Sequence, residues 1–288
     1  MVIAKRWFVL IIAVLLVTAC SVSRLAYLNA PPLVLWYVGG YVDMSDPQKT
    51  FLRERLTRAM AWHRQAELPE YQRTIEGLIG RVETKMSAQD VRTTYGDLKD
   101  YYQRSIEHLL PDFADFLLMI DASQLSHVES KFADDNRKMV KESVKGTPDD
   151  RRSLRTKRFI EQFEEWTGHL SNEQRQLISN RSQALSDSTE ERLGDRRYRQ
   201  AEILEIVRKK PKRDVAIATL HKLFIDTDSW RRPEYTRLLR ERDEAFIQVV
   251  AELSGTLTPE QRANLQRKLG GYSRDISSIT ARAFRPST

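Results

Sequence analysis

Apolar side chains recur along the chain with the spacing of amphipathic helices. Two clear stripes lie within residues 71–86 and 91–109, and similar stripes lie within 154–185 and 235–279. Residues three or four positions apart share one face of a helix. We find no convincing β-strand. Each stripe needs a facing partner, so the pattern predicts an all-α fold in which antiparallel helical hairpins form one elongated bundle or array.

One helix-start signal recurs, in which an apolar residue precedes Ser or Thr and an acid or amide follows three positions later. It occurs at Met44-Ser45, Met86-Ser87, Leu125-Ser126, Leu170-Ser171 and Leu257-Thr258. In such a capping box the hydroxyl accepts a backbone hydrogen bond and the acid or amide bonds back. The nearly even spacing, with one gap near Asp214, is explained by two related halves. So is the repeat of Pro69-Glu70-Tyr71 at Pro233-Glu234-Tyr235, although caps recur in any helical protein.

The N-terminus has the pattern of an export signal. Lys5 and Arg6 precede an apolar run over 7–17, which is too short to span a bilayer comfortably. The run ends in Val17-Thr18-Ala19-Cys20, which resembles the bacterial lipobox, whose cysteine is acylated and becomes the first residue of the mature protein. We therefore expect residues 1–19 to be removed and Cys20 to carry the acyl chains. The alternative is a signal anchor that contains a cysteine by chance.

Residues 20–44 form a lipid-attached segment that is unusually apolar and aromatic for a tether. Trp36, Tyr37 and Tyr41 crowd around Gly39-Gly40. We expect this segment to pack against the helices; the alternative is that it lies in the membrane interface, where Trp and Tyr are enriched. Residues 45–288 then form the helical domain, with its best internal break near 146–150.

The charge of the chain changes this picture little. Removal of Lys5 and Arg6 leaves 45 basic and 40 acidic residues, a modest excess that in the periplasm indicates a membrane surface rather than nucleic acid. Three basic clusters are Arg151, Arg152, Arg155, Lys157 and Arg158; Arg196, Arg197 and Arg199; and Lys209, Lys210, Lys212 and Arg213. Such clusters are usually solvated helix faces, and where one binds a partner, lipid phosphate fits best.

Catalytic signatures are mostly absent from the sequence. It contains no Gly-x-Ser-x-Gly elbow, no Ser-x-x-Lys, no His-Glu-x-x-His and no glycine-rich phosphate loop. Cys20 is the single cysteine, so a cysteine-based metal site has no second ligand. Glu165, His169 and Glu173 have the spacing of metal ligands, but a helix end predicted near Gly168 separates them. We predict no catalytic residue, no metal and no cofactor.

The candidate binding site is the stretch Trp62-His63-Arg64 together with Glu67, Pro69 and Tyr71. One interpretation is a helix end at which aromatic residues pack and polar residues pair. The other is a pocket for a partner peptide or an anionic group. An envelope enzyme would use His63 with Glu67 or Glu70 in a cleft.

Several short segments carry a resemblance to a known family. They are Cys20-Ser21, Tyr27-Leu28-Asn29-Ala30-Pro31, Trp36-Tyr37-Val38, Tyr41-Val42-Asp43, Gln48, Trp62-His63-Arg64 and Glu67-Leu68-Pro69-Glu70-Tyr71. This set resembles a family of Gram-negative lipoproteins that is catalogued only as a domain of unknown function. The resemblance implies a helical, envelope-tethered protein with no known activity, and Ser21 after the cysteine implies transfer to the outer membrane.

A second resemblance is to the Spy-like periplasmic chaperones, which are much shorter. Their Leu-Thr-x-x-Gln signature is similar to Leu257-Thr258-Pro259-Glu260-Gln261 and to Leu170-Ser171-Asn172-Glu173-Gln174.

From the lipobox, Ser21 and the missing catalytic signatures we expect a lipoprotein anchored in the outer membrane and facing the periplasm, with a non-enzymatic binding or scaffold role. Its expected partners are the membrane, through N-terminal acyl chains, and an envelope protein or anionic lipid. The alternatives are a periplasmic chaperone-like protein and an envelope enzyme acting on cell wall or lipid.

Overall fold

The computed structural model describes residues 19–144 and 146–282, which contain twelve α-helices and no strand. The predicted all-α fold is confirmed. The helices are α2 (Ala19–Leu28), α3 (Ala30–Gly39), α4 (Asp46–Ala66), α5 (Leu68–Arg81), α6 (Ala88–Met119), α7 (Ala122–Met139), α8 (Pro148–Thr167), α9 (Asn172–Gln183), α10 (Thr189–Lys209), α11 (Arg213–Phe224), α12 (Pro233–Ser254) and α13 (Pro259–Arg282). Residues 1–18 of the predicted signal lie outside the described residues, and only the backbone of Cys20 is described.

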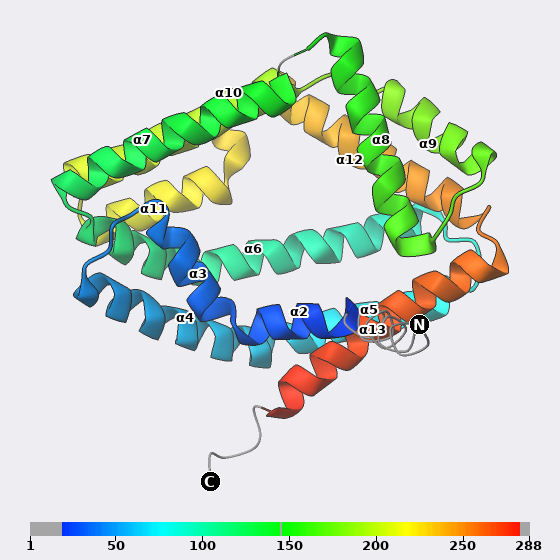
Figure 1. Ribbon diagram of the computed structural model, residues 1–288, viewed down its shortest axis with the longest axis horizontal. Helices are drawn as coiled ribbons and strands as arrows, with labels where there is room; N and C mark the ends of the chain where they lie inside the picture. Colours follow the sequence, from blue (N-terminus) through cyan, green and yellow to red (C-terminus); the bar gives the residue numbers. More distant parts are fainter. Residues whose placement is uncertain (1–18, 145, 283–288) are drawn as a thin grey trace, which may run out of the picture.

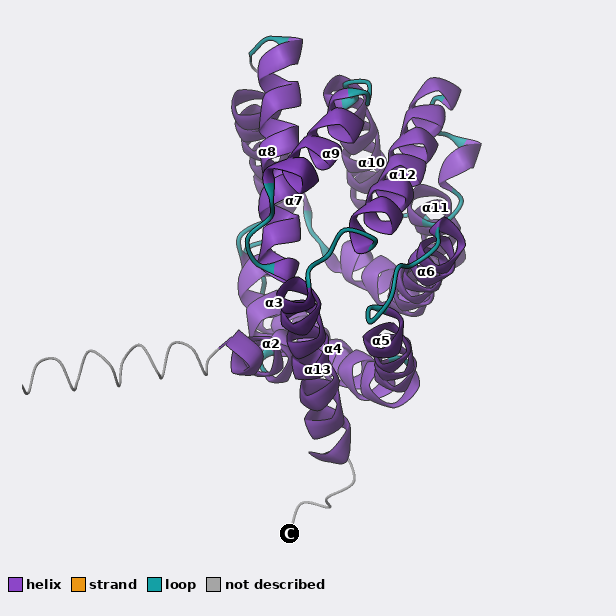
Figure 2. Ribbon diagram, turned by 90° about the vertical axis from the view of Figure 1, so that its right-hand side faces the viewer, coloured by secondary structure: helices purple, strands orange, loops and turns teal. Residues whose placement is uncertain are grey.

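The helices form a closed circuit rather than a row of successive hairpins (Figure 1). Consecutive helices do pair, as α8 does with α9, but α13 packs against α5 and α2 from the other end of the chain. Figure 2 shows α2, α3, α4 and α13 gathered at one side of the molecule. The long helix α6 contacts α4, α10, α11 and α12. Within the described residues, no helix combines the length and apolar character that a membrane span requires.

The core is divided between the two ends of α6. One buried cluster surrounds its C-terminal half and includes Ala114, Ile120 and Leu220. Another surrounds its N-terminal half and includes Val91. The residues of the described core clusters all lie between Tyr27 and Ile279. A chain that begins at Ser21 therefore keeps this packing.

Four of the five predicted helix starts are confirmed. Ser45, Ser87 and Ser171 are the N-caps of α4, α6 and α9, and α13 starts directly after Thr258. The predicted start at Ser126 is wrong, because that residue lies inside α7. The cap of α7 is an aspartate that precedes Ser126 by more than one helical turn, and its carboxylate accepts from two backbone N–H groups at 2.9 Å. A carboxylate satisfies these N–H groups as well as a hydroxyl does.

Two capping glutamines bind each other where α4 and α7 begin. The Nε2 of Gln48 donates to Oε1 of Gln124 at 2.8 Å, and the reverse bond is 2.7 Å. Each Nε2 also donates to the carbonyl that precedes the other helix: Gln48 to Met119 at 2.9 Å and Gln124 to Asp43 at 2.7 Å. Each Oε1 accepts from the N–H of its own cap residue. Every polar atom of both buried amides thus has a partner, as a stable buried polar group requires.

The same arrangement joins the beginnings of α9 and α13. The Nε2 of Gln174 donates to Oε1 of Gln261 at 2.9 Å, and the reverse bond is 2.8 Å. Gln174 also reaches the carbonyl of Thr256 at 3.0 Å, and Gln261 that of His169 at 2.7 Å. We call the two arrangements the glutamine junctions. In both junctions, each glutamine donates to the carbonyl two residues before the cap residue of the other helix. The same capping arrangement therefore occurs at the start of four helices.

Candidate functional site

The predicted site residues lie where α4 meets α5. Trp62, His63 and Arg64 belong to the last turns of α4, and Glu67 is the residue between the two helices. Pro69 lies in the first turn of α5, where its missing N–H costs no helical hydrogen bond. The local sequence therefore ends one helix and immediately begins the next.

His63 lies between two tyrosine hydroxyl groups. Its Nδ1 is 3.1 Å from the hydroxyl of Tyr27 in α2, and its Nε2 is 3.3 Å from that of Tyr71 in α5. Burial lowers the pKa of His63, and the nearby charge of Glu67 opposes this effect. Both imidazole nitrogens are thus occupied: the Tyr27 contact fastens α2 to α4, and the Tyr71 contact joins α4 to α5.

The carboxylate of Glu67 is buried beside these rings, with 2% of the residue exposed. Arg104 in α6 donates to both of its oxygens, at 3.0 and 2.9 Å. Trp62 stacks on His108 of α6, with ring centroids 3.7 Å apart and planes 6° apart. The site residues thus join α2, α4, α5 and α6, and none of the six lines either of the two apolar cavities described next.

The larger apolar cavity has a volume of about 730 Å³ and lies among α3, α4, α6, α7, α10 and α11. We call it the α3 cavity. Its walls include Val38, Leu52, Ile106, Phe113, Phe132 and Ile203. This volume is within the range of about 300–1,000 Å³ that is typical of ligand sites.

A polar hollow adjoins the α3 cavity and shares four lining residues with it: Tyr37, Tyr41, Arg196 and Arg199. The hydroxyl of Tyr41 donates to Asp135 at 2.5 Å. Burial by itself raises the pKa of Asp135, but hydrogen bonds from Tyr41 and Lys131 outweigh it and hold the pKa below its ordinary value. Arg196 lies 3.6 Å from the same carboxylate.

The second cavity, of about 490 Å³, lies among α5, α6, α8, α12 and α13, and we call it the α13 cavity. Its one lining arginine, Arg262, donates to the carbonyls of Val82 at 2.7 Å, Thr84 at 3.0 Å and Ser254 at 2.7 Å. An exposed apolar stripe on α6 lies between the cavities, because Leu98 lines one and Tyr102, one turn later, lines the other. Sequence periodicity identified this stripe without indicating that a cavity adjoins it.

The segment after Cys20 packs only in part. Leu35, Val38 and Tyr41 contact the core cluster of α6, as predicted. On the other face of α3, Trp36 is 78% exposed; Tyr37, at the edge of the cavity, is 60% exposed, and no residue of this helix is fully buried. The expectation of a packed segment is therefore correct for one face of α3 and wrong for the other, because α3 lies at the surface and only one of its sides contacts the body.

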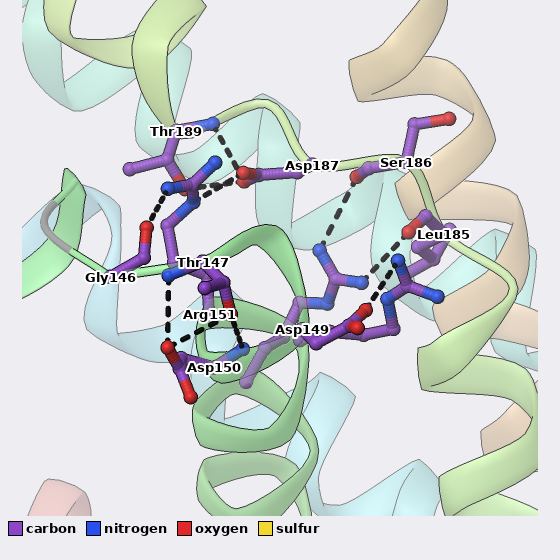
Figure 3. Close-up of polar contacts among 11 residues, drawn as sticks. Gly146, Thr147, Asp149, Asp150, Arg151, Leu185, Ser186, Asp187 and Thr189 are labelled. Atoms are coloured by element: carbon purple, nitrogen blue, oxygen red, sulfur yellow. Dashed lines mark hydrogen bonds and ion pairs between the residues drawn. The ribbon is translucent and has the colours of Figure 1, made fainter.

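Two members of the first basic cluster are used within the fold, Arg151 (Figure 3) and Arg155. Arg151 donates to Asp187 at 2.5 Å and to the carbonyl of Gly146 at 2.8 Å. Arg155 donates to the carbonyls of Leu185 at 2.7 Å and Ser182 at 3.0 Å. These contacts fasten the start of α8 to the connection between α9 and α10.

Two members of the third basic cluster, Lys210 and Arg213, are likewise bound within the fold. Lys210 donates to the carbonyls of Leu118 at 2.8 Å and Leu117 at 3.3 Å at the end of α6, and Arg213 pairs with Asp115 at 2.6 Å. Of the three clusters, the second contributes Arg196 and Arg199 to the α3 cavity described above. The predicted helix end between Glu165 and Glu173 is confirmed, since α8 ends at Thr167 and α9 begins at Asn172.

Comparison with known families identifies the family to which the chain belongs. The model of DUF6279, described as a family of unknown function, matches residues 40–236. The chain belongs to the DUF6279 family. The resemblance to an uncharacterised family is thereby confirmed. The part of this DUF6279 chain that matches contains the six predicted site residues and the arginines beside the α3 cavity. No curated protein and no solved structure matches the chain.

Proposed function

We propose that this DUF6279 protein is a lipid-anchored, non-enzymatic binding protein of the bacterial cell envelope. Cys20 carries the acyl chains, and the body faces the periplasm from the outer membrane. The observation that carries the proposal is the exposed apolar face of the helices that follow Cys20. Leu25, Leu33, Trp36 and Tyr37 belong to it.

This face suits the interface of a bilayer. Exposed apolar residues grouped on one short helix usually mark an interaction surface, and Trp and Tyr are enriched at the level of the lipid headgroups. Each buried methylene of an acyl chain adds ~0.8 kcal/mol, so several chains on Cys20 hold the protein at the membrane, and α3 then lies against it. The contacts of Tyr27 with His63 and of Ser23 with Asp275 fix α2 to the body beside the anchor.

The anchor is tested by the mass of the mature protein expressed in a Gram-negative host. We expect a chain that begins at Cys20 with acyl chains on its first residue and that fractionates with the outer membrane. Cys20→Ser should abolish both the added mass and membrane retention. A native chain that begins at Met1, or one that carries no hydrocarbon, contradicts the proposal.

The membrane contact of α3 is tested separately with the unacylated chain that begins at Ser21. We expect it to sediment with vesicles of phosphatidylethanolamine and phosphatidylglycerol, and Trp36→Ser to weaken this binding. Leu98→Ser removes an exposed, smaller apolar side chain from α6 and serves as the control. Equal vesicle binding by both variants contradicts the placement of α3 in the interface.

A second candidate function is that of a chaperone-like protein. The observation that favours it is the apolar stripe of α6, with Leu98 and Tyr102 exposed between two cavities. A chaperone-like role predicts that the chain beginning at Ser21 slows the aggregation of an unfolded client protein. No effect at stoichiometric excess removes this candidate. An enzyme acting through His63 has no such support, because its ring lies between two tyrosines.

A further inference from the structure

We infer that the α3 cavity and its polar hollow together bind an anionic amphiphile: a straight acyl chain in the cavity and a carboxylate or phosphate in the hollow. The inference rests on the proposed binding role and names its ligand. It is independent of the anchor on Cys20 and of the membrane contact of α3. Its test therefore uses the unacylated chain.

The apolar part of the site matches a hydrocarbon chain. The cavity holds about 730 Å³, and its lining from six helices is mostly aliphatic and aromatic, with the ion pair of Arg55 and Asp112 among its polar members. Burying apolar ligand surface against such walls is favourable because it removes that surface from water. Val34 and Val38 bring α3 to this wall, so the cavity lies directly beneath the helix that we place at the membrane.

The polar part of the site carries an excess of positive charge. The hollow is lined by Lys138, Arg192, Arg196 and Arg199 against two acids, Asp135 and Glu142. Glu142 lies 3.9 Å from Lys138, and Tyr41 already donates to Asp135. Arg199 lies 3.2 Å from the buried Asp195, so the positive excess in the hollow rests on Arg192, for which the described residues supply no ion pair.

Arg196 has hydrogen-bonding capacity that the described fold leaves unused. Its Nε is buried without a hydrogen-bond partner. Its one ion pair, to Asp135, is loose at 3.6 Å. A guanidinium has five N–H donors arranged to bind carboxylate or phosphate. Because Arg196 lines both the cavity and the hollow, it lies where the head of an amphiphile would meet its chain.

The α13 cavity provides the contrast within the same chain. Its arginine is fully engaged with three backbone carbonyls, and Glu165 at its wall pairs with Lys268 at 2.7 Å. The α3 cavity therefore has an arginine available to bind an anionic head group, and the α13 cavity does not. Selectivity for charge is therefore a property of the α3 cavity.

The test measures binding of laurate, below its micelle concentration, to the chain that begins at Ser21. Dodecyltrimethylammonium has the same chain length with a cationic head, and inorganic phosphate has a head without a chain. We expect laurate to bind at least about tenfold more tightly than the cationic amphiphile, since hydrogen bonds to charged groups are the strong ones. Equal affinity for both amphiphiles, or no binding of laurate, overturns the inference.

Variants assign the binding to the α3 cavity. Arg192→Gln combined with Arg199→Gln should weaken laurate binding about tenfold or more, whereas Arg197→Gln, the same change on an exposed side of α10, should not. Ile203→Trp should block the acyl chain itself. Circular dichroism establishes that each variant folds. Unchanged laurate affinity in folded variants of both kinds places the ligand elsewhere and overturns the inference.

A further experiment with lipid vesicles distinguishes a membrane phospholipid from a free fatty acid as the source of the amphiphile. Transfer of phosphatidylglycerol from vesicles to the protein, blocked by Ile203→Trp, identifies a membrane phospholipid. Laurate binding without such transfer identifies a free fatty acid. If the chain slows client aggregation but binds neither lipid, the amphiphile is excluded while the anchor and the chaperone-like role remain.

Discussion

Gln48 and Gln124 exchange side-chain hydrogen bonds although they cap different helices. The amides are buried, and each also holds the backbone on the opposite side of the pair. Gln174 and Gln261 have the same relationship at the other end of the molecule. The geometry of the first pair thus sets how α4 meets α7, and that of the second how α9 meets α13.

The first prediction concerns the coupling within this pair. Gln48→Leu should destabilise the chain by about 1–3 kcal/mol, because it leaves buried polar groups of the partner without a hydrogen bond. Gln124→Leu should do the same. In the double variant the cost should be clearly less than the sum, since neither amide then faces an unpaired one. Urea denaturation of all four forms measures the coupling.

The control for this cycle is Gln103→Leu on the exposed face of α6. It should change the free energy of unfolding by less than about 0.5 kcal/mol, as surface substitutions usually do. Strictly additive costs for Gln48→Leu and Gln124→Leu would show that the two side chains are not coupled in the native fold.

The second prediction separates the observed cap of α7 from the one that the sequence favoured. Asp121→Ala should lower the urea midpoint, because its carboxylate accepts from the N–H groups of Ser123 and Gln124. Ser126→Ala should leave the midpoint unchanged, since Ser126 is an exposed residue within the helix. The opposite order of effects would restore Ser126 as the helix start.

This cap illustrates how far sequence reasoning reached for the fold. Apolar spacing and caps predicted the helical class and most helix starts, because both depend on residues within a few positions of one another. The helix-start signal requires Ser or Thr, so it does not include Ile120-Asp121, although Gln124 supplies the amide at the third position. The pairing of Gln48 with Gln124 depends on how distant helices meet, which no local spacing encodes.

The candidate site shows the same boundary between local and distant information. The stretch from Trp62 to Tyr71 was recognised, but His108 and Arg104, which complete it from α6, were not. Arg196 and Arg199 were noticed only as a charge run. They lie beside Tyr41 and the α3 cavity because α3 and α10 meet there. Only the assembled structure therefore distinguishes this cluster from the two whose side chains make contacts within the fold.

The third prediction concerns the buried carboxylate of Glu67. Arg104→Ala should cost about 3 kcal/mol, because it leaves that carboxylate buried without its cation. Arg73→Ala, which removes the arginine of the exposed pair with Glu70, is the control and should cost less than about 1 kcal/mol. Guanidinium denaturation gives both values. Similar small losses for the two variants would mean that water replaces Arg104 at the carboxylate.

The last prediction follows from the lowered pKa of His63. Its ordinary value is 6.5, and burial places the native value below this, so the unfolded chain takes up the proton first as the pH falls. The contribution of neutral His63 to the free energy of unfolding is therefore fully present above the pKa of the unfolded chain. It is lost as the pH drops through about 6.5 toward the lower pKa of the native state. Denaturation at about pH 7.5 and about pH 5.5 measures this loss.

His63→Gln keeps a polar side chain between Tyr27 and Tyr71 but cannot titrate, so its loss of stability over the same pH interval should be smaller than that of the native chain. His127→Gln, at an exposed position of α7, should retain the native loss. If His63→Gln instead shows the full native loss, the acid sensitivity arises from other groups and the ring at position 63 does not resist protonation.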